Sequence, residues 1–403
     1  MFVGIFLANS FEWFDLVILG YFAAVIGKQF FPSHSQIASL SLVFATFGIT
    51  FLARPIGAVV LGAYSDRRGR RSALLLSVTL MTVATVAIAI LPTYAALGAV
   101  APVALVVART MQGFSAGGEF GSLTTFLVEY RPSARGFFGS LQFASQGFTA
   151  LLATSFGFVL TSVLSPTDLE NWGWRAPFLF GALIGPLGYF IRRTVSENPE
   201  FKPAHAPLKE IVTDGKRRTL ISLAAVTLGT VATYTIIFLP SYAHTYLAFS
   251  APNSFFGGLV TAMTLILFAP LAGAISDRLG RLVTMVPPVI ILFFASYPTF
   301  RWLVSAPTIE HLLIVQFAFG LLAAWYLGVL PSLMAELFPS RYRASGLSIS
   351  YAFGVTIFGG FTPVITTALI QYTGDKLIPG FYLIFAATVS LIGLLEARRI
   401  GIR

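Results

Sequence analysis

The sequence contains no cysteine, and only 10% of its 403 residues are charged. Without cysteine the chain can form neither a disulfide nor a thiolate metal site. The motif H-E-x-x-H and the P-loop G-x-x-x-x-G-K-[ST] are both absent, and the histidines lack the spacing of metal ligands. These histidines are His34, His205, His244 and His311. We therefore expect no metal, no cofactor, and neither enzymatic nor ATP-driven activity.

Apolar residues dominate the chain instead, and make up 56% of it. An average soluble domain carries about 25% charged residues, so this composition is typical of a membrane protein. Stretches without any Asp, Glu, Lys or Arg cover 72–108, 136–167 and 344–374. About 20 apolar residues are enough for a helix to cross a bilayer. We predict an all-α membrane protein with twelve transmembrane helices, at 2–27, 37–62, 73–92, 99–127, 137–163, 174–191, 219–247, 253–275, 283–305, 311–335, 346–370 and 378–396.

Basic residues are distributed unevenly between the expected loops. With the N-terminus inside, 20 of the 26 Lys and Arg residues fall in the inner loops and the C-terminus. Only Lys28, Arg175, Arg301 and Lys376 fall in the outer loops. The positive-inside rule therefore predicts cytoplasmic N- and C-termini. It also explains the net charge of +10 as an insertion signal, so no nucleic-acid partner is expected. The first span has neither a basic n-region nor a cleavage site, so it is expected to be a retained helix.

The two halves of the chain share a repeated signature. The loop GAYSDRRGRR begins at Gly62 and carries Asp66, and GAISDRLGRL begins at Gly273 and carries Asp277 at the same offset. Further on, EYRPSARG in the first half corresponds to ELFPSRYRASG in the second. Such half-to-half symmetry is typical of secondary transporters, with a substrate site near the bilayer midplane.

The longest polar stretch of the chain lies between these halves. It begins RRTVSENPEF at Arg192 and ends at Arg218. We predict an N-terminal six-helix bundle at 1–193, a cytoplasmic linker at 194–218 and a C-terminal six-helix bundle at 219–403.

These loops resemble the signature of the major facilitator superfamily. The motifs EWFD, FLARP, RTMQGFSAGGE and WGWRAPF are similar to those of its metabolite:proton symporter family. This resemblance implies two pseudo-symmetric six-helix bundles in a bacterial inner membrane. It also implies uptake of a small organic acid or zwitterion together with a proton. The stretch LQFASQ is more similar to members that carry tricarboxylates than to proline or betaine carriers.

The repeated loops are expected to act as gates. Their glycines permit close helix contact, and their aspartates can face the positive N-terminal end of another helix, for Asp66 that of the eleventh span by resemblance. Their arginines can pair with acids at helix ends. The residues assigned to these gates are Gly62, Asp66, Arg70, Glu129, Asp277 and Arg281.

Five ionisable residues fall inside predicted spans of the first half. These residues are Glu12, Asp15, Arg54, Arg109 and Glu119. An isolated charge at the bilayer centre costs on the order of 2.5–3.5 kcal/mol on insertion scales. Three acids against two arginines leave one negative charge that a single proton would neutralise. We predict that Asp15 carries the proton, with Glu12 and then Glu119 as alternatives; a purely structural ion-pair network is the other interpretation.

The two arginines are the candidates for binding a carboxylate substrate. The planar fork of a guanidinium matches a carboxylate, and both Arg109 and Arg54 offer one. Side chains expected to add hydrogen bonds are Gln112, Gln142, Gln146, Tyr234 and Tyr326. His244 lies near the outer end of its span and is interpreted as an interfacial residue.

Together these features predict a proton-coupled symporter of citrate or another di- or tricarboxylate, working by alternating access. Uptake of a zwitterion such as proline or betaine is the nearest alternative. An aromatic cage would favour a quaternary amine such as betaine, whereas the two interior arginines favour an anion. A drug-proton antiporter is a third alternative. The expected partners are the substrate, the proton and membrane lipid, and the chain is expected to be a monomer.

Overall fold

The computed structural model describes residues 2–68, 70–117, 119–182, 185 and 215–402. Within these ranges every regular element is a helix. Eight helical stretches of the described chain are long and apolar enough to cross a membrane, one of them formed by α16, a π-helical turn and α17 together, and the bent pair α1 and α2 makes a ninth when counted as one span. A helix satisfies its own backbone hydrogen bonds, which is the requirement for crossing lipid. The prediction of an all-α, multi-pass membrane protein is confirmed.

The first half contains nine described α-helices between Phe2 and Asn171. They are α1 (Phe2–Tyr21), α2 (Ala23–Phe30), α3 (Gln36–Arg68), α4 (Arg70–Ile90), α5 (Tyr94–Leu97), α6 (Val100–Ser115), α7 (Glu119–Tyr130), α8 (Arg135–Val163) and α9 (Pro166–Asn171), with short 3₁₀ turns at Pro132–Ala134 and Gly173–Arg175.

The helices of the second half are longer on average. They are α12 (Lys216–Leu247), α13 (Ala251–Leu279), α14 (Arg281–Ser305), α15 (Ile309–Leu337), α16 (Arg343–Gly354), α17 (Thr362–Thr373) and α18 (Ile378–Arg399), with a 3₁₀ turn at Ser340–Tyr342 and a π-helical turn at Val355–Gly359.

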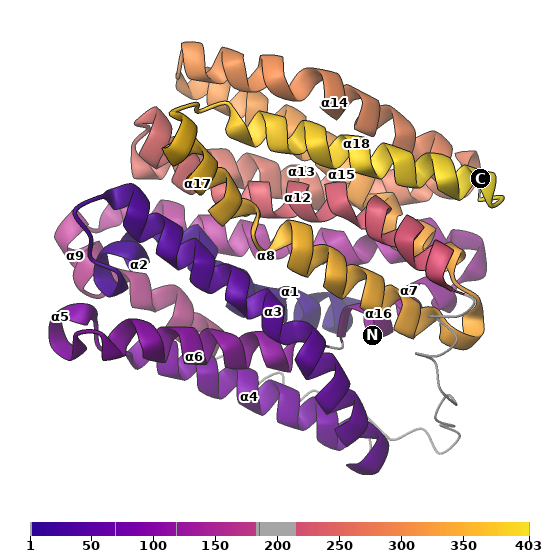
Figure 1. The fold of residues 1–403 in the computed structure, drawn as a ribbon, viewed down its shortest axis with the longest axis horizontal. Coiled ribbons are helices and arrows are strands. Elements are labelled where there is room, and N and C mark those ends of the chain that lie inside the picture. Colours follow the sequence, from indigo (N-terminus) through magenta and orange to yellow (C-terminus); the bar gives the residue numbers. More distant parts are fainter. Residues whose placement is uncertain (1, 69, 118, 183–184, 186–214, 403) are drawn as a thin grey trace.

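Most of α1 to α9 lies on one side of the molecule and most of α12 to α18 on the other, while α16 packs beside α7 where the halves meet (Figure 1). Eleven of the twelve expected spans correspond to described helices, several of them formed by two shorter helices in a row. The sixth expected span, 174–191, is described only at 174–182 and 185, and the predicted linker lies outside the described residues up to residue 214. The two-bundle architecture is therefore confirmed, and the domain boundaries stay a prediction.

Small residues let the helices approach closely. A Cβ atom on Gly113 would lie 1.8 Å from the carbonyl oxygen of Thr50 on α3. Between the halves, Gly136 of α8 and Gly273 of α13 are in mutual contact, because a Cβ on either would lie 2.2–2.3 Å from the carbonyl oxygen of the other. Small residues at such interfaces allow backbone contact between membrane helices.

Two spans are interrupted in mid-course. The first span bends by 65° between α1 and α2, at Phe22. The eleventh span contains the π-helical turn Val355–Gly359, and Thr356 within it donates a hydrogen bond of 3.0 Å to the carbonyl oxygen of Phe51 in the other half. Irregular backbone of this kind is tolerated in membranes where it is buried in protein, and π-turns often mark functional positions.

Candidate functional site

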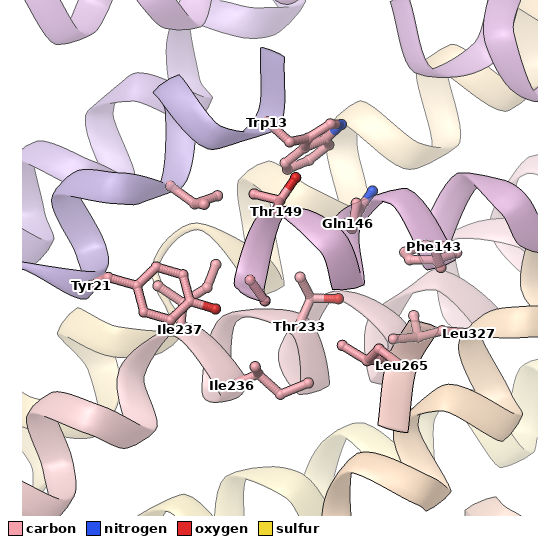
Figure 2. Close-up of a pocket in the computed structure, with 12 residues that line it drawn as sticks. Trp13, Tyr21, Phe143, Gln146, Thr149, Thr233, Ile236, Ile237, Leu265 and Leu327 are labelled. Carbon is pink, nitrogen blue, oxygen red and sulfur yellow. The ribbon is translucent and has the colours of Figure 1, made fainter. Parts of the chain in front are cut away.

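A small cavity lies between the two halves. It has a volume of about 30 Å³ and is lined from α1 and α8 on one side and from α12, α13 and α15 on the other. Figure 2 shows Trp13, Gln146 and Thr149 on one side of it, with Thr233 and Ile236 facing them. A cavity of this size holds one or two water molecules. The two halves are therefore closed around their centre in this structure.

The polar groups of this central cavity come mainly from α8. Gln146 is 8% exposed, and both atoms of its amide lack a hydrogen-bond partner within the described residues. Thr149 lies one helical turn further on and faces the same cavity. Gln146 was expected here from the sequence, whereas Trp13, Tyr21 and Thr149 were not. The spacing of three residues between Gln146 and Thr149 was a signal for the latter.

Arg109 on α6 is completely buried, and its guanidinium is held mainly by main chain. Nη1 donates to the carbonyl oxygen of Asp15 at 3.1 Å and to the Gln112 side chain at 2.6 Å, and Nη2 donates to the carbonyl oxygen of Leu16 at 2.6 Å. Gln112 in turn donates to the hydroxyl of Thr85 on α4 at 2.8 Å. Gln112, expected to bind substrate, is instead bonded to Arg109 and Thr85. Arg109 ties α6 to α1 and does not line the central cavity.

Asp15 is 5% exposed and lies beside this arginine. Its Oδ1 has no hydrogen-bond partner within the described residues, and a Cβ on Gly181 would lie 2.0 Å from that oxygen. Asn9, six residues before Asp15 on the same helix, points to α8 and donates to the hydroxyl of Ser145 at 2.6 Å. The reason is geometric: at about 100° per residue, each step of three lags a full turn by about 60°, so two steps separate Asn9 from Asp15 by about 120°. Glu12, between them, is partly buried.

Arg54 on α3 lies behind the wall of the cavity. Its guanidinium carbon is 5.0 Å from the ring centre of Trp13 and 5.6 Å from that of Phe51, and Nη2 donates to the carbonyl oxygen of Ala116 at 3.2 Å. Nη1 has no partner among the described residues. Since Trp13 lines the cavity, Arg54 is one side chain away from it.

The remaining expected substrate contacts are distributed differently. Gln142 donates to the side chain of Asn9 at 3.4 Å and so belongs to the α1–α8 interface. Tyr234 packs edge-on against Phe51 of the other half, with its hydroxyl unpartnered within the described residues. Tyr326 donates to the carbonyl oxygen of Ala225 at 2.6 Å, inside the second half. None of these three side chains lines the central cavity.

At one end of the bundle, Asp277 connects the two halves. Its carboxylate accepts the backbone N–H groups of Gly136 and Phe137 at 2.8 and 3.0 Å, which are in the first turn of α8. Arg281 donates to Asp277 at 2.8 Å and to Glu336 at 2.9 Å. An acid at a helix N-terminus satisfies free N–H groups and matches the positive end of the helix dipole. At the second repeat the aspartate therefore faces a helix N-terminus, and its role as a gate stays a prediction.

The symmetric half of this gate is only partly described. Glu129 at the end of α7 forms an ion pair with Arg343 at the start of α16, which joins the halves a second time. Gly62, Asp66 and Arg70 lie in described helical backbone, but their side chains are outside the described part, as is that of Glu119. Their roles stay predictions.

Comparison with known proteins agrees with this architecture. A profile of the Major Facilitator Superfamily matches residues 5–296 and 248–399. A citrate-proton symporter of Klebsiella pneumoniae is 37% identical over 391 residues, which cover 95% of this chain and 88% of that protein. A proline/betaine transporter of Salmonella typhimurium is 30% identical and covers 96% of this chain and 80% of its own length.

A solved structure extends the likeness to the fold. The crystal structure of a D-xylose-proton symporter superposes with a TM-score of 0.78 at 18% identity, and the match covers 96% of each chain. The repeated gating loops, the two helix bundles and these matches agree with one another: the chain belongs to the Major Facilitator Superfamily.

Proposed function

We propose that this protein is a proton-coupled symporter of a small organic acid, with citrate or another di- or tricarboxylate as substrate. Its halves would expose the central cavity to the two sides of a bacterial inner membrane in turn. The relationship to citrate-proton symporters over 95% of the chain supports the substrate class. We also propose that the protein is a monomer in contact with membrane lipid and that it has no nucleic-acid partner.

The observation that carries the coupling is the Asp15–Arg109 pair of neighbours. Both side chains are buried in the membrane-spanning part, and Oδ1 of Asp15 lacks a partner among the described residues. A buried carboxylate is costly unless its charge is paired or neutralised by a proton. A substrate carboxylate that draws Arg109 away would leave Asp15 to be neutralised by a proton. This exchange would link the two ligands.

The lining of the central cavity favours a second candidate. It includes Trp13, Tyr21 and Phe143, and no Asp, Glu, Lys or Arg occurs among the described residues that line it. Aromatic walls suit a quaternary amine such as betaine. The proline/betaine transporters among the relatives support this alternative. To bind an anion in this cavity, Arg54 or Arg109 would have to turn toward it, because neither lines it in the present closed state.

The orientation in the membrane follows from the gate and the charges. Both chain ends lie toward the same end of the bundle, where α7 and α16 also meet (Figure 1). Asp277, Arg281 and Arg343 belong to the loops that the positive-inside rule assigns to the cytoplasm. We therefore place both termini in the cytoplasm and regard the gate as closed on that side.

The test is uptake into proteoliposomes with and without an imposed pH gradient, using labelled citrate, other carboxylates, proline and betaine. We expect accumulation of a carboxylate only when the outside is acidic. Uptake of betaine with no carboxylate uptake would transfer the proposal to the zwitterion. Uptake of neither would refute both.

A further inference from the structure

A second cavity lies beyond the central one, at the end opposite to Asp277. It has a volume of about 220 Å³, several times that of the central cavity. Residues of both halves line it, among them Lys28 and Glu170 from the first half and His244 from the second. Under the proposed orientation this cavity is on the outer side.

One side chain separates the two cavities. Tyr21, the last residue of α1, lines both of them, and Phe22 and Phe255 next to it form a ring pair across the halves with centroids 5.7 Å apart. The 65° bend at Phe22 directs α2 along the outer cavity and places Lys28 in its wall. A molecule in the outer cavity is therefore next to the central one.

Lys28 in this wall forms an ion pair with Glu170 that is open to water. The Nζ of Lys28 lies 2.7 Å from Oε1 of Glu170, and the two side chains are 52% and 35% exposed. Ion pairs with this exposure contribute little to stability, because water competes for both groups. Lys28 is the only Lys or Arg among the described residues that line the cavity. Its ammonium has three donors, and the contact with Glu170 uses one.

We propose that the outer cavity is a capture site for organic anions, in which a substrate carboxylate replaces Glu170 on Lys28 before it passes Tyr21. The proposal rests on the proposed function, since it names the step that precedes entry into the central cavity. Glu170 acts as an internal competitor: it holds Lys28 in the wall while the cavity is empty and yields to a ligand with more than one carboxylate. Cations and neutral solutes gain nothing at this site.

The absence of cysteine from the chain allows a direct test that needs no transport. Gln36 lines the outer cavity and is exposed, so Gln36→Cys introduces a single thiol there. The rate at which a methanethiosulfonate reagent modifies it is measured in a sugar-headgroup detergent, where no lipid phosphate competes, with citrate or betaine added. We expect citrate to slow the reaction and betaine to leave it unchanged.

Three further substitutions in this background separate binding from structure. With Lys28→Gln the citrate concentration needed for half protection should rise up to roughly fivefold, the upper end of the range for losing a partly exposed charge contact. With Glu170→Gln it should fall, since the competitor is gone. Lys376→Gln is the matched control: it removes a charge expected at the same end but not lining the cavity, and protection should match that of Gln36→Cys alone.

Equal protection in the Lys28 and Lys376 variants would overturn the proposal. So would a weakened protection in Glu170→Gln, because the pair would then be structural. The outcome is distinguishable from failure of the proposed function: citrate protection without proton-driven uptake keeps the capture site and refutes the symporter, whereas uptake without protection does the reverse.

Discussion

At the scale of single residues, the buried Arg109 uses the donors of its guanidinium on groups of the protein. The two terminal nitrogens of Arg109 are used on the carbonyl groups of Asp15 and Leu16 and on Gln112. If Arg109 binds the substrate carboxylate as proposed, that carboxylate must compete with three hydrogen bonds, which a closed state can form and an open state can release. The guanidinium can do this because its donors are arranged in a rigid fork.

Arg109→Lys should therefore fold but lose most transport. An ammonium is a point charge on a flexible stem and cannot reproduce the fork, so we expect uptake at least tenfold lower at normal expression. Arg175→Lys is a matched control, because Arg175 also donates to two main-chain carbonyls, those of Asn171 and Leu91, away from the central cavity. Equal uptake in the two variants would contradict a special role for Arg109.

A substitution at Gly181 can move the carboxylate of Asp15 without changing its charge. Gly181→Ala places a methyl carbon 2.0 Å from Oδ1 of Asp15, which is too close for both atoms, so the carboxylate must turn away. Overpacking of this kind costs about 1–3 kcal/mol. Gly185→Ala crowds the Thr82 hydroxyl to a similar degree and serves as the control. If Asp15 carries the proton, proton-driven accumulation should fall several-fold more in Gly181→Ala, at comparable melting temperatures.

The sequence could predict some of these residues and not others. Of the side chains expected to contact substrate, Gln146 lines the central cavity, whereas Arg109 and Gln112 do not line it and are bonded to each other. The contact of Gly181 with Asp15 joins residues far apart in the chain, so no local pattern indicates it. Tyr326 was expected at the substrate, but a tyrosine on an apolar helix can equally satisfy its hydroxyl on a neighbouring carbonyl, as it does here.

At the scale of helices, the two halves are joined through helix ends. Asp277 of α13 caps the first turn of α8, and Glu129 of α7 pairs with Arg343 of α16. Both contacts are polar and lie where the loops of the repeat predicted a gate. The loop motif could be recognised in the sequence because its glycine and its acid recur at fixed offsets in both halves. The 65° bend at Phe22 and the π-turn Val355–Gly359 could not be predicted from the sequence, since they depend on packing against other helices.

Asp277→Asn should weaken this cap and open the cytoplasmic side. Asp277 accepts Gly136 with Oδ1 and Phe137 with Oδ2, so in Asn one of these charge-assisted hydrogen bonds becomes neutral and the other loses its acceptor. The loss is about 1–2 kcal/mol, or roughly five- to thirtyfold in the closed-to-open ratio. A single cysteine at Ser348, which packs on Gly121 across the halves, reports opening through its rate of thiol modification. Asp375→Asn, in a loop within one half, is the control. An unchanged rate would show that Asp277 does not hold the gate.

At the scale of the whole molecule, the structure is closed at its centre and more spacious toward one end. The central cavity has about 30 Å³ and the outer one about 220 Å³, while the opposite end is joined by Asp277 and by the pair of Glu129 with Arg343. Alternating access requires these contacts to break while others form. At the Asp277 end the halves are joined by these polar contacts and by the ring pair of Phe120 with Tyr351, so the transition must break both kinds of contact.

Coupling is a property of this whole cycle, and it can be removed without stopping the cycle. Neutralising the proton carrier, Asp15→Asn or Glu12→Gln, should abolish accumulation driven by a pH gradient, while counterflow exchange of substrate survives because it needs no net proton movement. The pH dependence of exchange should flatten in the same variant, since the titrating group is gone. Asp15 is the stronger candidate, because its buried Oδ1 lacks a partner within the described residues and Arg109 lies beside it. Asp168→Asn, an exposed carboxylate bonded to Ser165 in the loop before α9, should change neither readout. Accumulation with normal pH dependence in both single variants would make these acids structural and move the proton to Glu119.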